Sequence, residues 1–376
     1  MRVRVGRADG TDEVLTGVLP ADGPLEVPVS GEIAWVEPAA DGIGYYAWTL
    51  PDPALDALLA AAPGLEAPER ADIVAMLGLQ RRAGVRTLGD LLQRAAPFTA
   101  DPDPSVATIA VHQVDDLGIV DLMDDPALKE SAHAWLRAHL RPALDRVGLE
   151  PAAGEPAELG ELRTALLYTL ADAGDPDVVA YGQRIGLSVP ETPELSAELA
   201  GFGLWSLART TATPDQTQQM LLEWADAEAD PSRRERLLRA AGQVAGEAAL
   251  TAAFERAVRP ETSMSDTFTL IDGVTTRDDE SERDLLLSLA ERHHDALVAK
   301  APPVFAPQLA RFGGGCSEAR LADARAFYGD PARSGPGTEH VLQQVADQVA
   351  GCLERIERDA PSVRALVAEP QTAQRQ

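Results

Sequence analysis

The histidines are the side chains most able to bind a transition metal. They are His112, His133, His139, His293, His294 and His340. A helix of the His-Glu-x-x-His type places two histidines four residues apart, so that both imidazoles face the same side. No two histidines here have that spacing, and the closest pairs would point to different sides of their helices. We therefore predict no metal ligand in this chain.

Cys316 is the best-placed candidate nucleophile. It follows Gly313-Gly314-Gly315, so it would lie at or before the N-terminus of a helix, where the pKa of a thiol falls. His340 is the histidine that could act as its base. The simpler interpretation is a glycine-rich turn that leads into a helix with a buried thiol. We predict no catalytic residue, and catalysis by Cys316 is kept as an alternative hypothesis.

Cys352 is the other cysteine. Two cysteines this far apart in sequence define neither a disulfide framework nor a zinc site. They could pair if two C-terminal helices brought them together, and the sequence leaves that question open.

The charge balance argues against two classes of partner. The chain has 60 acidic residues against 33 lysines and arginines, a net charge of −27. Nucleic acids and anionic membrane surfaces both need clustered positive charge. No run reaches the roughly 18 apolar residues of a membrane span. We predict no nucleic-acid partner and no membrane association.

Localisation is left unknown by the sequence. The first residues, Met1-Arg2-Val3-Arg4-Val5, lack the long apolar core of a signal peptide. A cytoplasmic location is the expectation only if the chain is complete.

Residues 1–50 are predicted to contain short strands. Glycines separate brief apolar segments with a period of two. The strand candidates are Val3 with Val5, Val14 with Leu15, Leu25 with Val27, Ile33 with Trp35, and Ile43 to Trp48. Such a small sheet has little core of its own and should pack against something else.

After residue 50 the pattern becomes helical. An Asp or Thr followed by Pro marks repeated helix starts, because the side chain caps free N–H groups and proline suits the first helical position. These pairs are Asp52-Pro53, Asp103-Pro104, Asp125-Pro126, Asp175-Pro176, Thr213-Pro214, Asp230-Pro231 and Asp330-Pro331. Apolar residues recur between them at helical spacing.

The predicted fold is mainly α: a curved α-α superhelix of HEAT- or armadillo-like helix pairs with a small N-terminal β-rich segment. The clearest helix pairs are 155–173 with 175–185, and 214–229 with 231–246. The predicted domains are a β-rich segment at 1–50, a helical domain at 51–365 and a frayed tail at 366–376. Residues 259–283 are predicted to begin with a loop and to contain a charged segment around Arg277 to Glu280.

The segment from Ile33-Ala34-Trp35-Val36 to Gly44-Tyr45-Tyr46, followed by a leucine-rich helix, resembles the C-terminal half of the aminopeptidase N family of zinc metallopeptidases. Later stretches of the chain resemble further segments of the same family and follow in the same order. They are 65–92, 144–149, 162–167, 173–176, Phe312 to Cys316, and Phe327-Tyr328. The resemblance covers about residues 30–365 and is greatest to the endoplasmic-reticulum-aminopeptidase-like C-terminal domain.

Two departures from that family pattern matter. Ala47 stands where the family strand has arginine, and Leu50 stands near its second tyrosine. The larger departure is that the zinc helix and the Gly-x-Met-Glu-Asn loop have no counterpart, so no catalytic residue carries over and no activity is expected of this chain alone.

The resemblance implies that this region bounds the peptide chamber of a metallopeptidase and controls access to it. Its partners would be a catalytic domain, on the same parent chain or a separate subunit, and a peptide substrate. Zinc is expected in that missing domain. The loop 259–266 is the candidate for the chamber face, with Arg259 and Asp266 as peptide contacts.

A free-standing HEAT-like scaffold is the alternative. It would bind protein partners through a concave face, which helical stacks commonly offer. A His-Glu-x-x-His domain in the parent reading frame or a neighbouring gene would favour the peptidase reading.

Overall fold

The computed structural model describes residues 1–123, 125–276 and 280–368, apart from the side chain of Ser281. The chain forms two compact units. The first comprises residues 1–117, 134–169 and the chain from 362 onward, and the second comprises 118–133 and 170–361. Within the described residues the fold is mainly helical, with a small three-stranded sheet at the N-terminus, as predicted. No described helix is long and apolar enough to cross a membrane.

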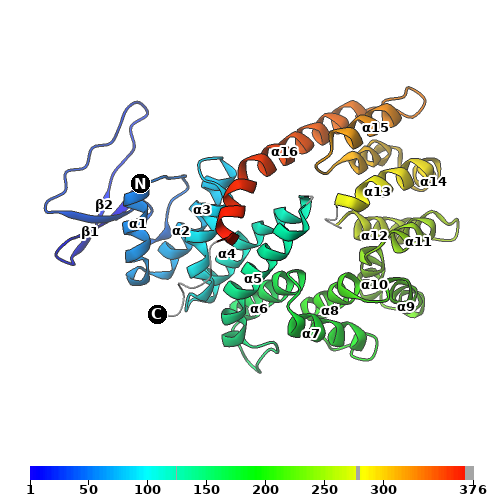
Figure 1. Ribbon diagram of the computed structural model, residues 1–376, viewed down its shortest axis with the longest axis horizontal. Coiled ribbons are helices and arrows are strands. Elements are labelled where there is room, and N and C mark those ends of the chain that lie inside the picture. The colour runs from blue at the N-terminus through cyan, green and yellow to red at the C-terminus, as the bar shows by residue number, and fades with distance from the viewer. Residues whose placement is uncertain (124, 277–279, 369–376) are drawn as a thin grey trace. The chain divides into compact units, whose positions relative to one another are not determined.

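The sheet of the first unit has the order β2-β1-β3, with both pairs antiparallel. Its strands are β1 (Arg2–Arg7), β2 (Asp12–Thr16) and β3 (Ile33–Glu37). They confirm three of the predicted strands. The sheet lies next to α1 (Asp52–Ala61), which packs on β3 (Figure 1).

Two predicted strands are wrong. Residues 25–27 are irregular, and the side chain of Leu25 instead covers Gly17. The segment 43–48 is also not a strand, because the chain turns sharply just before it, with positive φ at both Asp41 and Gly42. A Cβ on Gly42 would lie 2.7 Å from the Pro68 carbonyl oxygen, so only glycine fits there.

The remaining helical elements of the first unit follow in short steps. They are η1 (Ala40–Gly42), η2 (Ala62–Gly64), α2 (Ala67–Arg82), α3 (Leu88–Ala95), η3 (Ala96–Ala100) and α4 (Pro104–Asp115). Three further elements extend across the boundaries between the units or lie at them: η4 (Asp116–Leu122), α5 (Pro126–Val147) and α6 (Ala157–Asp172).

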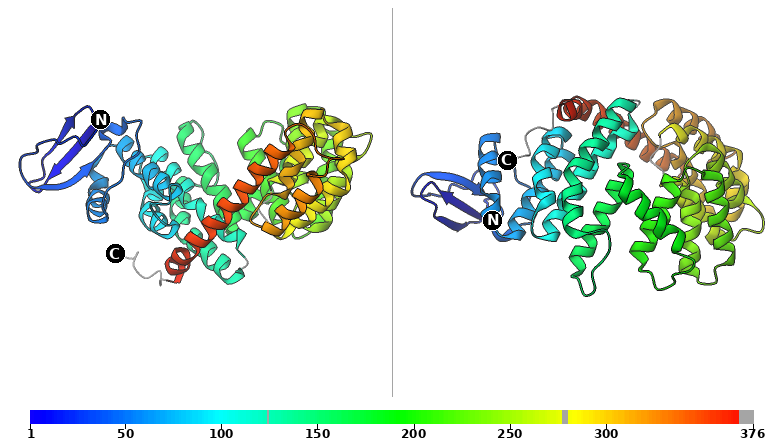
Figure 2. Two further views of the ribbon diagram at one scale, coloured as in Figure 1. Left: turned by 90° about the horizontal axis from the view of Figure 1, so that it is seen from above. Right: turned by 60° about the horizontal axis from the view of Figure 1, so that its bottom comes forward.

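The second unit contains the longer run of helices. They are α7 (Pro176–Ser188), α8 (Ala197–Thr210), α9 (Pro214–Ala227), α10 (Pro231–Gln243), α11 (Glu247–Val258), α12 (Met264–Thr275), α13 (Glu280–Arg292), α14 (His294–Lys300), η5 (Pro303–Gly313), α15 (Glu318–Tyr328) and most of α16 (Thr338–Ala368). Helices α7 to α10 lie side by side, and α9 packs on α10 as predicted (Figure 2). The HEAT-like superhelix is consistent with this pairing and stays a prediction.

Most of the predicted helix starts are confirmed. The side chains of Asp103, Asp175 and Asp230 accept bonds from free N–H groups of α4, α7 and α10. Asp125 accepts one from Leu128 N at 3.0 Å. Helices α1 and α9 begin where predicted, but Asp52 is the first residue of its helix rather than the cap, and the Thr213 side chain makes no cap bond. Asp330-Pro331 starts no helix, because Asp330 closes a turn by accepting from Ala332 N, and α16 begins only at Thr338.

Two other predictions concern less regular stretches. Residues 264–275 form α12, so the stretch 259–283 contains a regular helix after its loop. Residues 277–279 of the predicted charged segment lie outside the described residues. Of the predicted frayed tail, residues 366–368 continue α16 and 369–376 lie outside the described residues, so the frayed tail stays a prediction.

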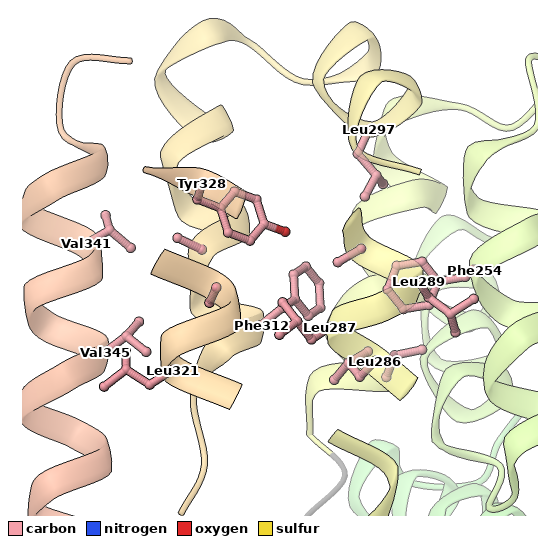
Figure 3. Close-up of a cluster of buried hydrophobic side chains, with 14 of the residues drawn as sticks. Phe254, Leu286, Leu287, Leu289, Leu297, Phe312, Leu321, Tyr328, Val341 and Val345 are labelled. Atoms are coloured by element: carbon pink, nitrogen blue, oxygen red, sulfur yellow. The ribbon is translucent and has the colours of Figure 1, made fainter. Parts of the chain in front are cut away.

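A hydrophobic core joins the C-terminal helices of the second unit. Phe312 lies at its centre, with its ring centroid 5.8 Å from that of Phe254 (Figure 3). Leu289 from α13, Tyr328 from α15 and Val345 from α16 are buried around it. This core fixes η5 against α13 and α15 and so positions the surface described below.

Candidate functional site

The histidines are placed in separate packing environments. The described residues contain no group of three histidine, cysteine or carboxylate side chains that could hold a metal ion. His139 stacks on Trp135 at 3.8 Å, and burial lowers its pKa. His294 packs against the rings of Phe327 and Tyr328.

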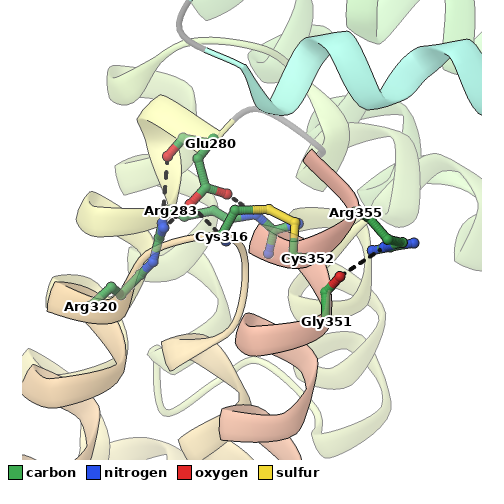
Figure 4. The surroundings of a disulfide bond; sticks show 7 residues. All are labelled: Glu280, Arg283, Cys316, Arg320, Gly351, Cys352 and Arg355. Carbon is green, nitrogen blue, oxygen red and sulfur yellow. Dashed lines mark hydrogen bonds and ion pairs between the residues drawn. A yellow bond between two sulfur atoms is a disulfide. The ribbon is translucent and has the colours of Figure 1, made fainter. Parts of the chain in front are cut away.

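Cys316 forms a disulfide with Cys352, and their Cα atoms are 5.4 Å apart (Figure 4). The bond ties the turn before α15 to the middle of α16. A disulfide-bonded sulfur is no nucleophilic thiolate, so the structure contradicts the reading of Cys316 as a catalytic thiol. It also answers the question of pairing that the sequence left open.

Glu280 fixes the turn on which Cys316 lies. Its Oε1 accepts the backbone N–H of Cys316 at 3.0 Å and is ion-paired with buried Arg320. Gly315 has a φ of +111°, and a Cβ there would lie 2.7 Å from the Glu280 carboxylate. Gly315 therefore has a structural role, because its lack of a side chain lets the backbone approach the ion pair of Glu280 and Arg320.

The two predicted peptide contacts lie on either side of a helix start. Arg259 directly follows α11 and is exposed, while Asp266 is in the first turn of α12, capped by Ser263. The Asp266 carboxylate accepts a bond from Arg234 at 2.7 Å, so its charge is already paired. The loop between them is held by Lys300, whose Nζ donates to the carbonyls of Arg259 and Thr262, each at 2.6 Å.

A groove lies beside this loop in the second unit, with a volume of about 670 Å³. We call it the aromatic groove. It runs between α12, α13, the end of α14 and η5, and its apolar lining includes Phe268, Ile271, Leu286, Leu297, Leu309 and Phe312. Phe305 lines the rim, and its ring lies 5.5 Å from that of Phe268. These two rings are 46% and 39% exposed.

Positive charge gathers at the aromatic groove, although the chain is strongly acidic. Arg283, Lys300 and Arg311 line it, against one acid, Asp272. Asp272 is ion-paired with Arg239, and Arg283 is ion-paired with Glu280, so Lys300 and Arg311 carry the charge of the rim. The groove thus combines an apolar floor with a basic rim.

In the first unit, α2 holds the segment that turns after β3. Glu69 is buried, and its Oε1 accepts bonds from Arg4 Nε at 2.7 Å and Asp41 N at 3.0 Å. Asp72 accepts a bond from Trp48 Nε1 at 2.7 Å. Two carboxylates of one helix therefore fix β1, η1 and the buried Trp48.

Glu37 completes this carboxylate cluster at the end of β3. It is fully buried, and its Oε1 accepts a bond from Ala39 N at 2.9 Å. Its Oε2 has no hydrogen-bond partner among the described residues. Burial, with the nearby charges of Asp72 and Glu69, raises the pKa of Glu37 to about 8.

A family model described as the ERAP1-like C-terminal domain matches residues 35–351. The chain belongs to this family. The match starts within β3 and reaches into α16, so it includes the carboxylate cluster, the loop 259–266 and the aromatic groove. No curated protein matches the chain. The family assignment confirms the predicted resemblance to the C-terminal domain of the aminopeptidase N family.

Two features of this ERAP1-like C-terminal domain were not predicted from its sequence. The aromatic groove draws residues from five elements, so no local pattern marks it. One sequence feature could have pointed to the groove: Lys300, on its rim, is one of only two lysines in the chain, with Lys129. The carboxylate cluster around Glu37 was missed because Glu37 is more than 30 residues from Glu69 and Asp72 in the sequence and meets them only in the fold.

Proposed function

We propose that this ERAP1-like C-terminal domain is the non-catalytic region of an aminopeptidase N-like metallopeptidase. In this account it bounds the peptide chamber and controls access to a zinc site on a different polypeptide segment. The observation that carries the proposal is the family match over residues 35–351.

The chemistry of the described residues supports a non-catalytic role. They offer no three-ligand metal cluster, and Cys316 is in a disulfide. A zinc peptidase keeps three protein ligands and an open position for water. Zinc and the reacting groups would therefore come from the partner catalytic domain.

The loop 259–266 is our candidate for contact with the peptide. Arg259 is exposed and could pair with a carboxylate of a bound peptide. Asp266 is the second proposed contact, and its ion pair with Arg234 holds its carboxylate at the start of α12. Lys300 adds rigidity by holding the loop backbone.

Zinc content and turnover of the purified chain test the non-catalytic assignment. Metal analysis should find no stoichiometric zinc, and aminopeptidase substrates should not be cleaved. One zinc per chain together with chelator-sensitive turnover would contradict the proposal. If no His-Glu-x-x-His domain is encoded in the parent reading frame or beside it, the scaffold alternative is favoured.

A further inference from the structure

We propose that the aromatic groove binds an anionic amphiphile with a hydrocarbon body, of the class of long-chain carboxylates. The hydrocarbon would lie on the apolar floor, and the carboxylate would meet the basic rim. This site goes beyond the proposed function and does not depend on it.

The shape and lining of the groove fit a small ligand. Ligand sites commonly have volumes of roughly 300–1,000 Å³ and mainly apolar walls, and this groove has about 670 Å³. Its floor is rigid, because Leu286, Leu297 and Phe312 belong to the hydrophobic core in Figure 3. The exposed pair Phe268 and Phe305 extends this apolar surface to the rim.

The rim charges fit an anion. Lys300 donates to two backbone carbonyls, and Arg311 donates to the amide oxygens of Gln308 and Gln344. Neither has a carboxylate partner among the described residues, although acids outnumber bases almost two to one in the chain. A ligand carboxylate would supply the missing counter-charge.

Three polar groups of the lining already have partners within the chain, which favours a hydrocarbon body over a peptide backbone. Thr267 donates to Ala257 O at 2.7 Å, and Thr275 donates to Asp272 O at 3.0 Å. The Gln308 amide oxygen accepts from Arg311. A bound peptide needs partners for its own N–H and C=O groups, whereas a hydrocarbon chain needs none.

Calorimetric titration of the purified chain with decanoate and dodecanoate, both below their micellar concentrations, tests the proposal. We expect one site per chain. Each buried methylene should tighten binding by about threefold to fourfold, so dodecanoate should bind roughly tenfold more tightly than decanoate. Dodecanol, which lacks the charge, should bind about tenfold more weakly, and dodecyltrimethylammonium more weakly still.

Variants locate the site. Ala306→Trp should fill the groove and weaken dodecanoate binding at least tenfold, without changing any charge. Phe268→Ser with Phe305→Ser should do the same, and both rings are exposed enough for the fold to tolerate the change. Arg311→Gln should weaken dodecanoate but not dodecanol. Val304→Ser is the matched control, because Val304 is exposed beside Phe305 yet does not line the groove.

Three results would overturn the proposal: equal binding of dodecanoate to the parent and Ala306→Trp chains, equal binding of the cationic amphiphile, or no dependence on chain length. A peptide with a free apolar C-terminal residue serves as a further probe. The groove is a peptide site, and our assignment is wrong, if two results are found together: dodecanoate does not bind, and the peptide binds the parent chain but not the Ala306→Trp chain.

Discussion

At the scale of single residues, the carboxylates of α2 and β3 do most to hold the N-terminal segment in place. Glu69 is saturated with donors, whereas Glu37 has one bond and one unpartnered oxygen. Glu69 therefore stabilises the segment through the donors bonded to it, whereas Glu37, whose pKa is raised by burial, stabilises the segment when it is neutral.

Replacing Glu69 should be costly. Glu69→Ala removes acceptors for Arg4 Nε, Asp41 N and Glu66 N, and leaves the Arg4 charge without its buried partner. We expect the free energy of unfolding of the first unit to fall by about 3 kcal/mol. Asp12→Asn also removes a partner of Arg4, but at a more exposed site, and should cost less than about 1 kcal/mol. Equal losses from the two variants in urea titrations would contradict this assignment.

Glu37 should make the stability of the segment depend on pH. Because the pKa of Glu37 is about 8 in the folded chain and 4.5 normally, the folded state holds a proton that the unfolded state has lost between these values. The stabilisation is therefore complete below about pH 4.5 and is lost as pH rises to 8, with a slope of up to about 1.4 kcal/mol per pH unit.

Glu37→Gln should remove that slope. The measurement is hydrogen exchange of residues 33–48 between pH 5 and pH 9, corrected for the intrinsic rate. Glu32→Gln, at an exposed glutamate just before β3, is the control and should keep the parent slope. If the Glu37→Gln chain kept the parent slope, another group would be the one that titrates.

At the scale of elements, two features fix helices to their neighbours: glycines where backbones approach closely, and one disulfide. Helices α7 and α8 meet at Gly186 and Gly203, where a Cβ on Gly186 would lie 2.4 Å from the Gly203 carbonyl oxygen. The disulfide joins the turn before α15 to α16.

Alanine at the helix crossing should be destabilising. Gly186→Ala forces α7 and α8 apart, and we expect a loss of about 2 kcal/mol in the free energy of unfolding of the second unit. Gly351→Ala is the matched control, because a Cβ on Gly351 would meet no atom within 4 Å. It should instead stabilise α16 by up to about 1 kcal/mol. Similar effects of both variants in guanidinium titrations would refute the close-contact argument.

Removal of the disulfide should also destabilise the second unit. The bond closes a loop with a sequence separation of 36, for which chain entropy predicts a contribution of about 3–4 kcal/mol. The double variant Cys316→Ser/Cys352→Ser, compared with the oxidised parent in guanidinium, measures it. Two reactive thiols in the denatured, unreduced parent would show that the bond is not formed.

At the scale of the whole molecule, the sequence predicted features such as helix starts, which depend on residues close together in the chain. Asp103, Asp175 and Asp230 mark helix starts because a cap acts on its own next two or three residues. The strand prediction was wrong for the segment around Tyr46. Its side chains form hydrogen bonds to other parts of the fold, whereas its backbone pairs with no strand among the described residues. Tyr46 donates to Pro38 O at 2.6 Å, and Trp48 donates to α2.

The candidate sites were less predictable than the fold. The pairing of Cys316 with Cys352, the carboxylate cluster and the aromatic groove each depend on residues brought together by tertiary packing. Family resemblance supplied the function class, but the placement of Arg259 and Asp266 required the structure. Their assignment as peptide contacts stays a prediction.

Arg259 provides a test of that prediction in an active assembly. Arg259→Ala should raise KM for peptides long enough to reach the loop 259–266 by about threefold to tenfold, through loss of a charge-assisted bond, with kcat for a dipeptide unchanged. Arg292→Ala, at another exposed arginine, is the control. A uniform effect of Arg259→Ala on substrates of every length would argue against peptide contact.

The most direct test of the central claim joins this domain to a catalytic domain. A His-Glu-x-x-His polypeptide encoded in the same reading frame or beside it should be produced with and without this ERAP1-like C-terminal domain, and its cleavage rate measured on peptides of increasing length. We predict a one-to-one assembly whose rate depends on peptide length, and a loss of that dependence without the domain. No association, together with the same length profile in both preparations, would contradict the account.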